Sequence, residues 1–117
     1  MVSQQLLKVI GVSQKSVKQK ERSQEWFIIM HPRDNVAVAL RDIQRCTRLK
    51  LPKGNHTVDI VVNQKVPFGH KFATERIGKN QSVRKYGEMI GKATKPIRIG
   101  EWVHTHNLES VRGTHVT

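Results

Sequence analysis

The sequence predicts one mainly β domain that follows a basic N-terminal extension. The chain has 117 residues, which is the size of a single domain. Beyond Trp26, short runs rich in β-branched residues alternate with segments that contain Gly, Pro or Asn, and no segment shows sustained helical periodicity. The expected strands are residues 26–30, 36–40, 57–62, 83–86, 89–93 and 101–106.

Two segments between these strands are typical of turns. They are residues 52–55, with the sequence PKGN, and residues 67–69, with the sequence PFG. Proline presets its own φ angle for a turn, and glycine accepts a positive φ that other residues rarely adopt. We therefore expect the chain to reverse its direction at both segments.

A short motif occurs three times at identical internal spacing. It consists of an alanine, an isoleucine after three intervening residues, a turn position after two more, and an aliphatic residue after another two. The three copies are Ala39, Ile43, Cys46 and Leu49; Ala73, Ile77, Asn80 and Val83; and Ala93, Ile97, Gly100 and Val103. We expect the isoleucines to lie in the core. Since glycine and asparagine accept positive φ more readily than cysteine, Cys46 indicates either a different first turn or a strained one.

The N-terminal extension, residues 1–25, contains five Lys or Arg and two Glu. We expect it to be mobile, with one or two helical turns around Leu6, Leu7 and Ile10. It lacks the uninterrupted apolar segment of a secretory signal. No apolar run approaches the ~20 residues of a membrane-spanning helix, and the single cysteine excludes an internal disulfide. These features predict a soluble, cytoplasmic protein without a membrane partner.

The formal net charge of +12 admits three interpretations. The charge can bind nucleic acid or another polyanion, attract small anionic substrates, or simply keep the surface solvated. The basic residues of the domain are spread singly along the chain, and the sequence contains neither a zinc finger nor a helix-turn-helix pattern. A nucleic-acid partner is therefore disfavoured, whereas a solvated surface and the attraction of small anionic substrates, such as acidic sugars, both stay open.

Four sequence blocks carry a resemblance to a known family. They are HPRDNVAVALRDI at 31–43, VPFGHKFA at 66–73, RKYGEMIGKAT at 84–94 and IRIGEWVHTHN at 97–107. In this order and spacing they resemble the SAF domain of the altronate and galactarate dehydratase family. The resemblance implies a β-clip fold over residues 26–110, followed by a tail at 111–117. The family's turn glycine is replaced in the first two copies of the motif by Cys46 and Asn80.

The resemblance also implies a function. In that family the domain precedes a larger catalytic region or stands alone as the small subunit of a two-chain lyase. The implied reaction is the removal of water from a sugar acid such as altronate, with a divalent metal such as Fe²⁺ or Mn²⁺ shared with a large catalytic subunit. The alternatives are a stand-alone module that binds a carbohydrate or sugar acid and, more weakly, a polyanion binder. An exposed edge strand in so small a β domain makes a homo-oligomer a further hypothesis.

His104 and His106 are the candidate metal ligands. They lie two residues apart in an expected strand, so their imidazoles would project from one face and could chelate a divalent ion. A third ligand would have to come from His70, from a carboxylate or from the missing subunit. Asn107 follows directly and could orient an imidazole or bind a sugar hydroxyl.

The candidate catalytic residues are His70 and Lys71, which follow the turn at 67–69. Lys71 can neutralise a substrate carboxylate, and His70 can transfer a proton near neutral pH. Asp34 and Asn35 can close a turn by bonding to nearby backbone, and the family resemblance adds them as candidate substrate-binding residues. The site hypothesis requires the imidazoles of residues 70, 104 and 106 to converge.

Overall fold

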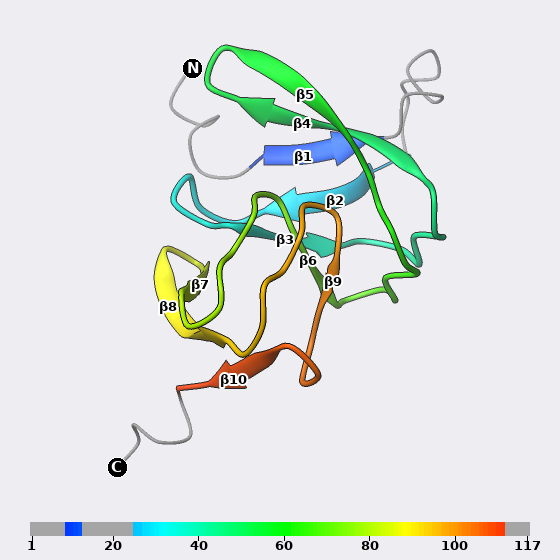
Figure 1. The fold of residues 1–117 in the computed structure, drawn as a ribbon. Coiled ribbons are helices and arrows are strands. Elements are labelled where there is room, and N and C mark those ends of the chain that lie inside the picture. Colours follow the sequence, from blue (N-terminus) through cyan, green and yellow to red (C-terminus); the bar gives the residue numbers. More distant parts are fainter. Residues whose placement is uncertain (1–8, 13–24, 112–117) are drawn as a thin grey trace.

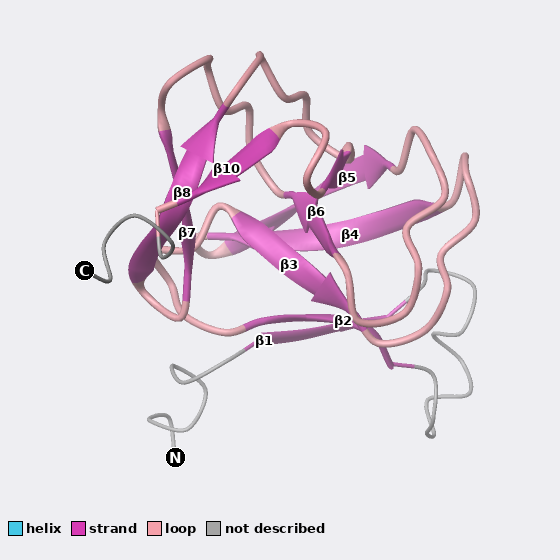
Figure 2. Cartoon of the chain, turned by 90° about the horizontal axis from the view of Figure 1, so that it is seen from below, coloured by secondary structure: helices cyan, strands magenta, loops and turns pink. Residues whose placement is uncertain are grey.

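The computed structural model describes residues 9–12 and 25–111, which form strands and no helix within these ranges (Figures 1 and 2). The prediction of a mainly β fold is therefore confirmed. Within the described part of the chain, no helix is long and apolar enough to cross a membrane. The strands are β1 (Val9–Val12), β2 (Glu25–Ile29), β3 (Val36–Ala39), β4 (Arg48–Lys53), β5 (His56–Val61), β6 (Lys71–Ala73), β7 (Ser82–Lys85), β8 (Glu88–Ala93), β9 (Trp102–Val103) and β10 (Leu108–Ser110).

A five-stranded antiparallel sheet, in the order β1-β2-β3-β6-β9, forms the centre of the fold. Ala37 opposes Phe72, and Phe72 opposes Trp102. Since opposed residues of antiparallel strands project to the same face, these side chains share one face of the sheet. Phe27 joins them from β2 and packs edge to face against Phe72, with ring centroids 5.7 Å apart.

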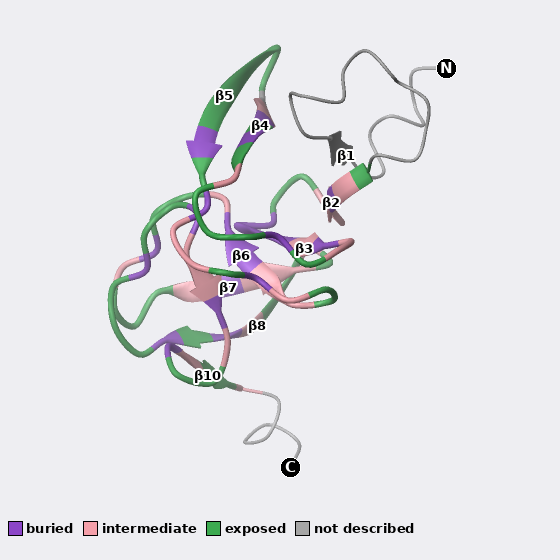
Figure 3. Ribbon diagram, turned by 90° about the vertical axis from the view of Figure 1, so that its right-hand side faces the viewer, coloured by how far each residue is buried: buried purple, intermediate pink, exposed green. Residues whose placement is uncertain are grey.

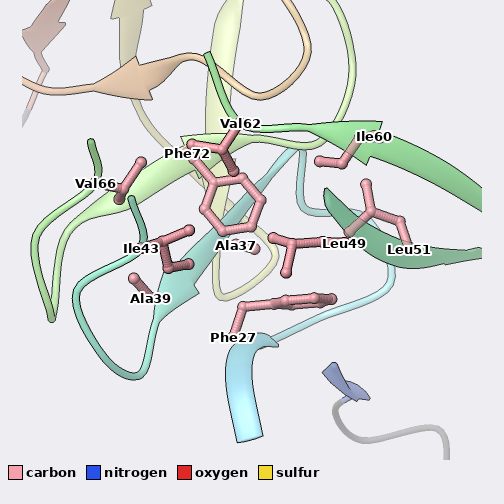
Figure 4. Packing of buried hydrophobic residues seen from close by; sticks show 10 residues of the cluster. All are labelled: Phe27, Ala37, Ala39, Ile43, Leu49, Leu51, Ile60, Val62, Val66 and Phe72. Carbon is pink, nitrogen blue, oxygen red and sulfur yellow. The ribbon is translucent and has the colours of Figure 1, made fainter. Parts of the chain in front are cut away.

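The hairpin β4–β5 covers that face (Figures 1 and 4). Its Leu49, Leu51 and Ile60 are buried in the same cluster as the two phenylalanines. The outer part of β5 is exposed, and its buried segment lies at Ile60 (Figure 3). Burying large apolar side chains contributes roughly 1.5–3 kcal/mol each, so this layer supplies much of the stability of the domain.

The opposite face of the central sheet meets a three-stranded sheet in the order β10-β8-β7. Val36, Ala73 and Val103 from the central sheet are buried there with Val83 from β7 and Ala93 from β8. The central sheet is thus covered on both faces, in Figure 1 by β4 and β5 above and by β7, β8 and β10 below. Lys71, opposed to Val38 and Val103, lies on this second face.

The structure shows a fourth copy of the repeated motif, in which other residue types occupy the alanine and isoleucine positions. Val62, Val66, Gly69 and Phe72 have the same spacing, with valine in place of both alanine and isoleucine. The four copies are joined in pairs by isolated bridges, Ile43 to Val66 and Ile77 to Ile97. The expectation that the isoleucines lie in the core is confirmed, because all three are at most 2% exposed.

Each pair of copies closes with the same two backbone hydrogen bonds. The turn position of each copy donates its N–H to the first residue of its partner copy. The four bonds run from Cys46 to Val62 at 2.7 Å, from Gly69 to Ala39 at 2.9 Å, from Asn80 to Ala93 at 2.7 Å, and from Gly100 to Ala73 at 2.8 Å. The domain is therefore built from two similar clasps, each made of two turns that face one another.

All four turn positions have positive φ. The angles are 73° at Cys46, 85° at Gly69, 70° at Asn80 and 86° at Gly100. Positive φ at the third residue is characteristic of a type II turn. The first copy therefore has the same geometry as the others, and Cys46 adopts a conformation that costs an L-residue roughly 1–2 kcal/mol. Of the two alternatives for Cys46, the strained loop is the correct one.

The N-terminal region differs from the expectation. Ile10 lies in β1, which pairs with β2 from Val9 opposite Ile29 onward, so the predicted helical turn is wrong at this residue. The β-branched residues of β1 favour a strand, and the edge of β2 supplies hydrogen-bond partners for it. Leu6 and Leu7 lie outside the described residues.

Several expected boundaries are also wrong. Residue ranges 48–53, 71–73 and 108–110 form strands that the sequence pattern does not predict. The turn expected at 52–55 starts too early, because Pro52 pairs with Thr57 and the chain reverses at Gly54, where φ is +68°. Proline is tolerated in this two-stranded hairpin, where one side of the strand has no ladder partner.

Candidate functional site

Three histidines and a tryptophan gather where β6 begins and β9 ends. We call His70, Trp102, His104 and His106 the histidine cluster. The His70 and His104 rings have centroids 4.7 Å apart, and the Trp102 ring stacks on His104 at 5.2 Å with an interplanar angle of 7°. Trp102 also contacts His106 at 5.1 Å. The structure thus brings the imidazoles of residues 70, 104 and 106 together around Trp102, and their role in a site stays a prediction.

Two turns carry the imidazoles. His70 ends the turn that starts at Pro67, whose carbonyl accepts the His70 N–H at 2.9 Å. His104 lies just after β9, and the expected strand at 101–106 is wrong beyond Val103 because the chain turns there. His104 and His106 therefore converge on Trp102 through a turn and not through strand alternation.

Asn107 shapes the second turn. It is completely buried, its Oδ1 accepts the His104 N–H at 2.9 Å, and its Nδ2 donates to the Trp102 carbonyl at 2.9 Å. Its backbone also accepts the Thr94 N–H at 2.9 Å. Asn107 thus fixes the backbone of two members of the histidine cluster. Its contact with a sugar hydroxyl stays a prediction.

His70 accepts a hydrogen bond from Trp102, with 3.1 Å between Nδ1 and the indole Nε1. Indole nitrogen is a donor and never an acceptor, so Nδ1 of His70 must offer its lone pair. The neutral ring then carries its proton on Nε2. His70 accordingly presents an N–H donor to a ligand while this bond is intact.

Lys71 follows His70 in the chain and lies on the second face of the central sheet, as a half-buried cation whose charge acts on His104. Burial lowers the pKa of Lys71, and the nearby charge of Lys85 lowers it further. The ion pairs seen in the described part of the chain are Lys50 with Asp59 and Lys65 with Asp42, so Lys71 has no acidic partner there. A half-buried cation without a counter-ion attracts an anionic ligand.

Burial also lowers the pKa of His104 below its ordinary 6.5, and His70, Lys71 and His106 lower it further through their charges. Neighbouring positive charges and burial both disfavour the protonated, charged form of a histidine. His104 is therefore neutral at pH 7, with a lone pair available on its ring.

The donor set for a metal ion is incomplete. Among the described residues, no group of three or more His, Cys, Asp or Glu side chains is arranged to hold a metal ion. His70 does not supply the third ligand through Nε2 while Nδ1 accepts the Trp102 bond, because Nε2 then bears the proton. The residues present do not fit a complete Fe²⁺ or Mn²⁺ site, and the two candidate ligands, His104 and His106, stay a prediction.

Asp34 and Asn35 bind the β7–β8 hairpin instead of facing the histidine cluster. The Asp34 carboxylate accepts the N–H groups of Tyr86 and Gly87 at 3.0 and 2.8 Å. Tyr86 has a φ of +60°, which explains why its turn needs this support. Asn35 accepts the Arg84 N–H at 2.8 Å, so both side chains hold backbone, and their substrate-binding role stays a prediction.

Sequence reasoning missed two contributors to the site. The first is Trp102, whose ring contacts all three histidines of the cluster. The spacing W-x-H-x-H would have been the signal for this contact. The second is Lys85 in β7, whose charge lowers the pKa of Lys71 in the central sheet. No local sequence pattern indicates that these two lysines lie close together.

Comparison with known proteins places this geometry in a family. The family model of the altronate/galactarate dehydratase SAF domain matches residues 25–111. The chain is 44% identical over 84 residues to an altronate dehydratase of Bacillus subtilis, which covers 72% of the chain and 16% of that relative. It is 31% identical over 84 residues to the galactarate dehydratase (L-threo-forming) of Escherichia coli, covering 72% of the chain and 15% of the relative.

A shorter relative is similar over a larger share of its own length. The chain is 36% identical over 58 residues to the (2R)-sulfolactate sulfo-lyase subunit alpha of Chromohalobacter salexigens, covering 50% of the chain and 62% of that subunit. The chain thus spans about one sixth of the dehydratases that it matches and most of the lyase subunit. The family match covers most of the chain and the whole strand framework from β2 to β10, so this chain belongs to the altronate/galactarate dehydratase SAF domain family.

Proposed function

We propose that this domain is the small subunit or N-terminal domain of a sugar-acid dehydratase-like lyase, and that it completes the active site of a larger catalytic subunit. The observation that carries the proposal is the His70–His104 ring pair at 4.7 Å, together with the half-buried Lys71, whose positive charge acts on His104. The names of the relatives support it, because they are two sugar-acid dehydratases and a subunit of another lyase. A cytoplasmic location for the complex is part of the proposal.

The chemistry assigns a role to each group. Loss of water from a sugar acid starts with removal of a proton beside the carboxylate, which requires a base and nearby positive charge. Lys71 would bind the carboxylate, and neutral His104 would accept the proton through its free lone pair. The Nε2–H of neutral His70 would hydrogen-bond the departing hydroxyl, and the proton that His104 has accepted would pass to this hydroxyl, so that water leaves, a carbon–carbon double bond remains and His104 is neutral again.

A divalent ion belongs to the proposal only through the larger subunit. His104 and His106 supply two imidazoles at most, and the remaining ligands would have to come from the partner chain. The two roles of His104 exclude each other, because a lone pair that binds an ion cannot accept the substrate proton, so the proton transfer above applies to the cluster without a bound ion. No step above depends on such an ion.

The test is a turnover assay on the assembled complex. The tagged chain is purified from its native cells together with the lyase subunit that binds it, and galactarate and altronate are supplied with Fe²⁺ or Mn²⁺. We expect formation of a 2-keto-3-deoxy acid, and a loss of at least about 100-fold when His104→Ala and His106→Ala are combined. His56→Ala, on the exposed part of β5, is the matched control and should leave turnover unchanged.

Two results would contradict the proposal. One is a complex that contains a larger chain but dehydrates neither acid. The other is full turnover by the double histidine variant, because the cluster would then have no part in the reaction.

A further inference from the structure

A polar groove lies beyond the opposite end of β6 from the histidine cluster. It has a volume of about 440 Å³ and is lined by Asn35, Glu75, Arg76, Asn80, Gln81, Ser82 and Arg84. His70 precedes β6, whereas Glu75 and Arg76 follow it, so the two sites are separated by the length of this strand. Every lining residue is polar or charged.

The floor of the groove is rigid. Asn35 is 4% exposed and binds β7 at two points, accepting the Arg84 N–H at 2.8 Å and donating to the Ser82 carbonyl at 3.0 Å. The Arg84 side chain is oriented by its Nε, which donates to the Arg33 carbonyl at 2.8 Å. Its two terminal nitrogens therefore keep their donors for a ligand.

The walls carry further unsatisfied groups. Gln81 uses its Oε1 to accept the Gly78 N–H at 2.8 Å, and its NH₂ group donates to no acceptor among the described residues. Asn80 stands at the tip of the same turn with its side chain exposed. Arg76 and Arg84 form no ion pair with any acidic side chain in the part of the chain that the structure describes.

These groups match one ligand chemistry. Two guanidinium groups recognise a carboxylate, for which their planar donors are suited. The amides of Asn80 and Gln81, the Ser82 hydroxyl and the Glu75 carboxylate can exchange hydrogen bonds with hydroxyl groups. An apolar ligand would find no complementary surface, and a bare polyanion would meet Glu75.

We propose that this groove is a second ligand site, which binds a small polyhydroxylated carboxylate through Arg76 and Arg84 and its hydroxyls through Asn80, Gln81 and Ser82. The site is separate from the histidine cluster and does not depend on the lyase function. It requires no partner chain, so binding to the isolated protein tests it directly.

The experiment is a titration of the full-length ¹⁵N-labelled chain, followed by amide chemical shifts. The probes are galactarate, the uncharged polyol galactitol, and succinate, which has two carboxylates and no hydroxyl. We expect saturable shifts confined to residues 75–84 and to Asn35 with galactarate, and at least about tenfold weaker binding of each of the other two.

Three variants sharpen the test. Arg76→Gln should weaken galactarate binding about tenfold, and the fold should tolerate it, because the Arg76 side chain forms no hydrogen bond or ion pair with the described residues. Asn80→Gly keeps the positive φ of the turn and removes the amide, so it should weaken binding without loss of stability. Lys79→Gln removes a charge from the same turn outside the groove lining and should leave binding unchanged.

The proposal is overturned if galactarate produces no saturable shifts, or if succinate or galactitol binds as tightly as galactarate. It is also overturned if Lys79→Gln weakens binding as much as Arg76→Gln does, because the effect would then be one of net charge. None of these results bears on turnover by the lyase complex, so the two proposals fail separately.

Discussion

The turn at residues 67–70 and the three equivalent turns differ in what their last side chain does. The four last positions are Thr47, His70, Gln81 and Glu101. Three of them bond back to the first residue of their own turn. Thr47 Oγ1 donates to the Gln44 carbonyl at 2.7 Å. The side chains of Gln81 and Glu101 accept the N–H groups of Gly78 and Arg98, respectively, at 2.8 Å each. His70 instead reaches across to Trp102.

Proline explains why His70 is free to do so. The first residue of its turn is Pro67, which has no N–H that a side chain at the last position could satisfy. The next N–H, that of Phe68, is taken by the Asp42 carboxylate at 2.8 Å. The backbone needs of this turn are therefore met without His70. In this copy of the repeated unit, the last side chain is not needed to close the turn, and it contacts Trp102 instead.

The largest expected effect separates the two kinds of turn by activity. In the proposed lyase complex, His70→Ala should lower kcat by about 10²-fold, since losing one hydrogen-bond donor that stabilises charge in the transition state typically costs this much. Gln81→Ala removes the equivalent side chain of another turn and should leave kcat unchanged. Steady-state kinetics on both complexes provide the measurement. Equal losses in the two variants would show that His70 has a merely structural role.

The second effect distinguishes the His70 turn from the Gln81 turn by stability. Gln81→Ala should lower the free energy of unfolding by about 1 kcal/mol, because the Gly78 N–H loses its acceptor. His70→Ala should lower the free energy of unfolding by less, because the first residue of its turn is Pro67, which has no N–H that needs an acceptor. Urea denaturation of the isolated chain measures both values. A larger loss for His70→Ala would mean that the Trp102 bond is a main support of the fold.

The third effect concerns strain at the turn position. Cys46→Gly should raise the free energy of unfolding by up to about 1 kcal/mol, since glycine adopts a φ of 73° without a steric penalty. Gly69→Ala, in the facing turn, should lower it by a similar amount or more, because a side chain would be placed at a φ of 85°. Open space around a Cβ at residue 69 ensures that this second variant reports backbone strain and not a clash.

Sequence patterns predict the regular parts of this molecule well. The mainly β class and the core isoleucines follow from β-branched runs and from the spacing of the repeat. The fourth copy stays hidden because Val62 and Val66 replace the expected residue types, although valine fills the same buried positions. β6 is missed because a strand of three residues has too few positions to show an alternation.

The candidate site is predictable in part for a similar reason. His70, His104 and His106 can be singled out by residue type and by the family blocks in which they lie. The Trp102–His70 bond joins residues 32 positions apart, and it decides which nitrogen of His70 carries the proton. The polar groove depends on how β7 packs against residue 35, a contact between distant segments that no local spacing encodes.

The smallest effect tests whether Lys71 and the cluster act on each other. Lys71→Met should raise the pKa of His104 toward 6.5, since it removes one of the positive charges that lower it. Proton NMR titration of the imidazole resonances measures the shift directly. Lys50→Met, on β4 and paired with Asp59, is the control and should leave the pKa of His104 unchanged.

The same shift gives a pH dependence of stability with a definite sign. Between the lowered folded pKa and the unfolded value near 6.5, the unfolded chain binds more protons at His104 than the folded chain does. The free energy of unfolding should therefore fall as pH drops from about 6.5 through the folded pKa, and less steeply in Lys71→Met. If the pKa of His104 stays the same in Lys71→Met, the charge of Lys71 does not act on His104. The proposal that Lys71 binds the substrate carboxylate next to His104 would then lose its electrostatic support.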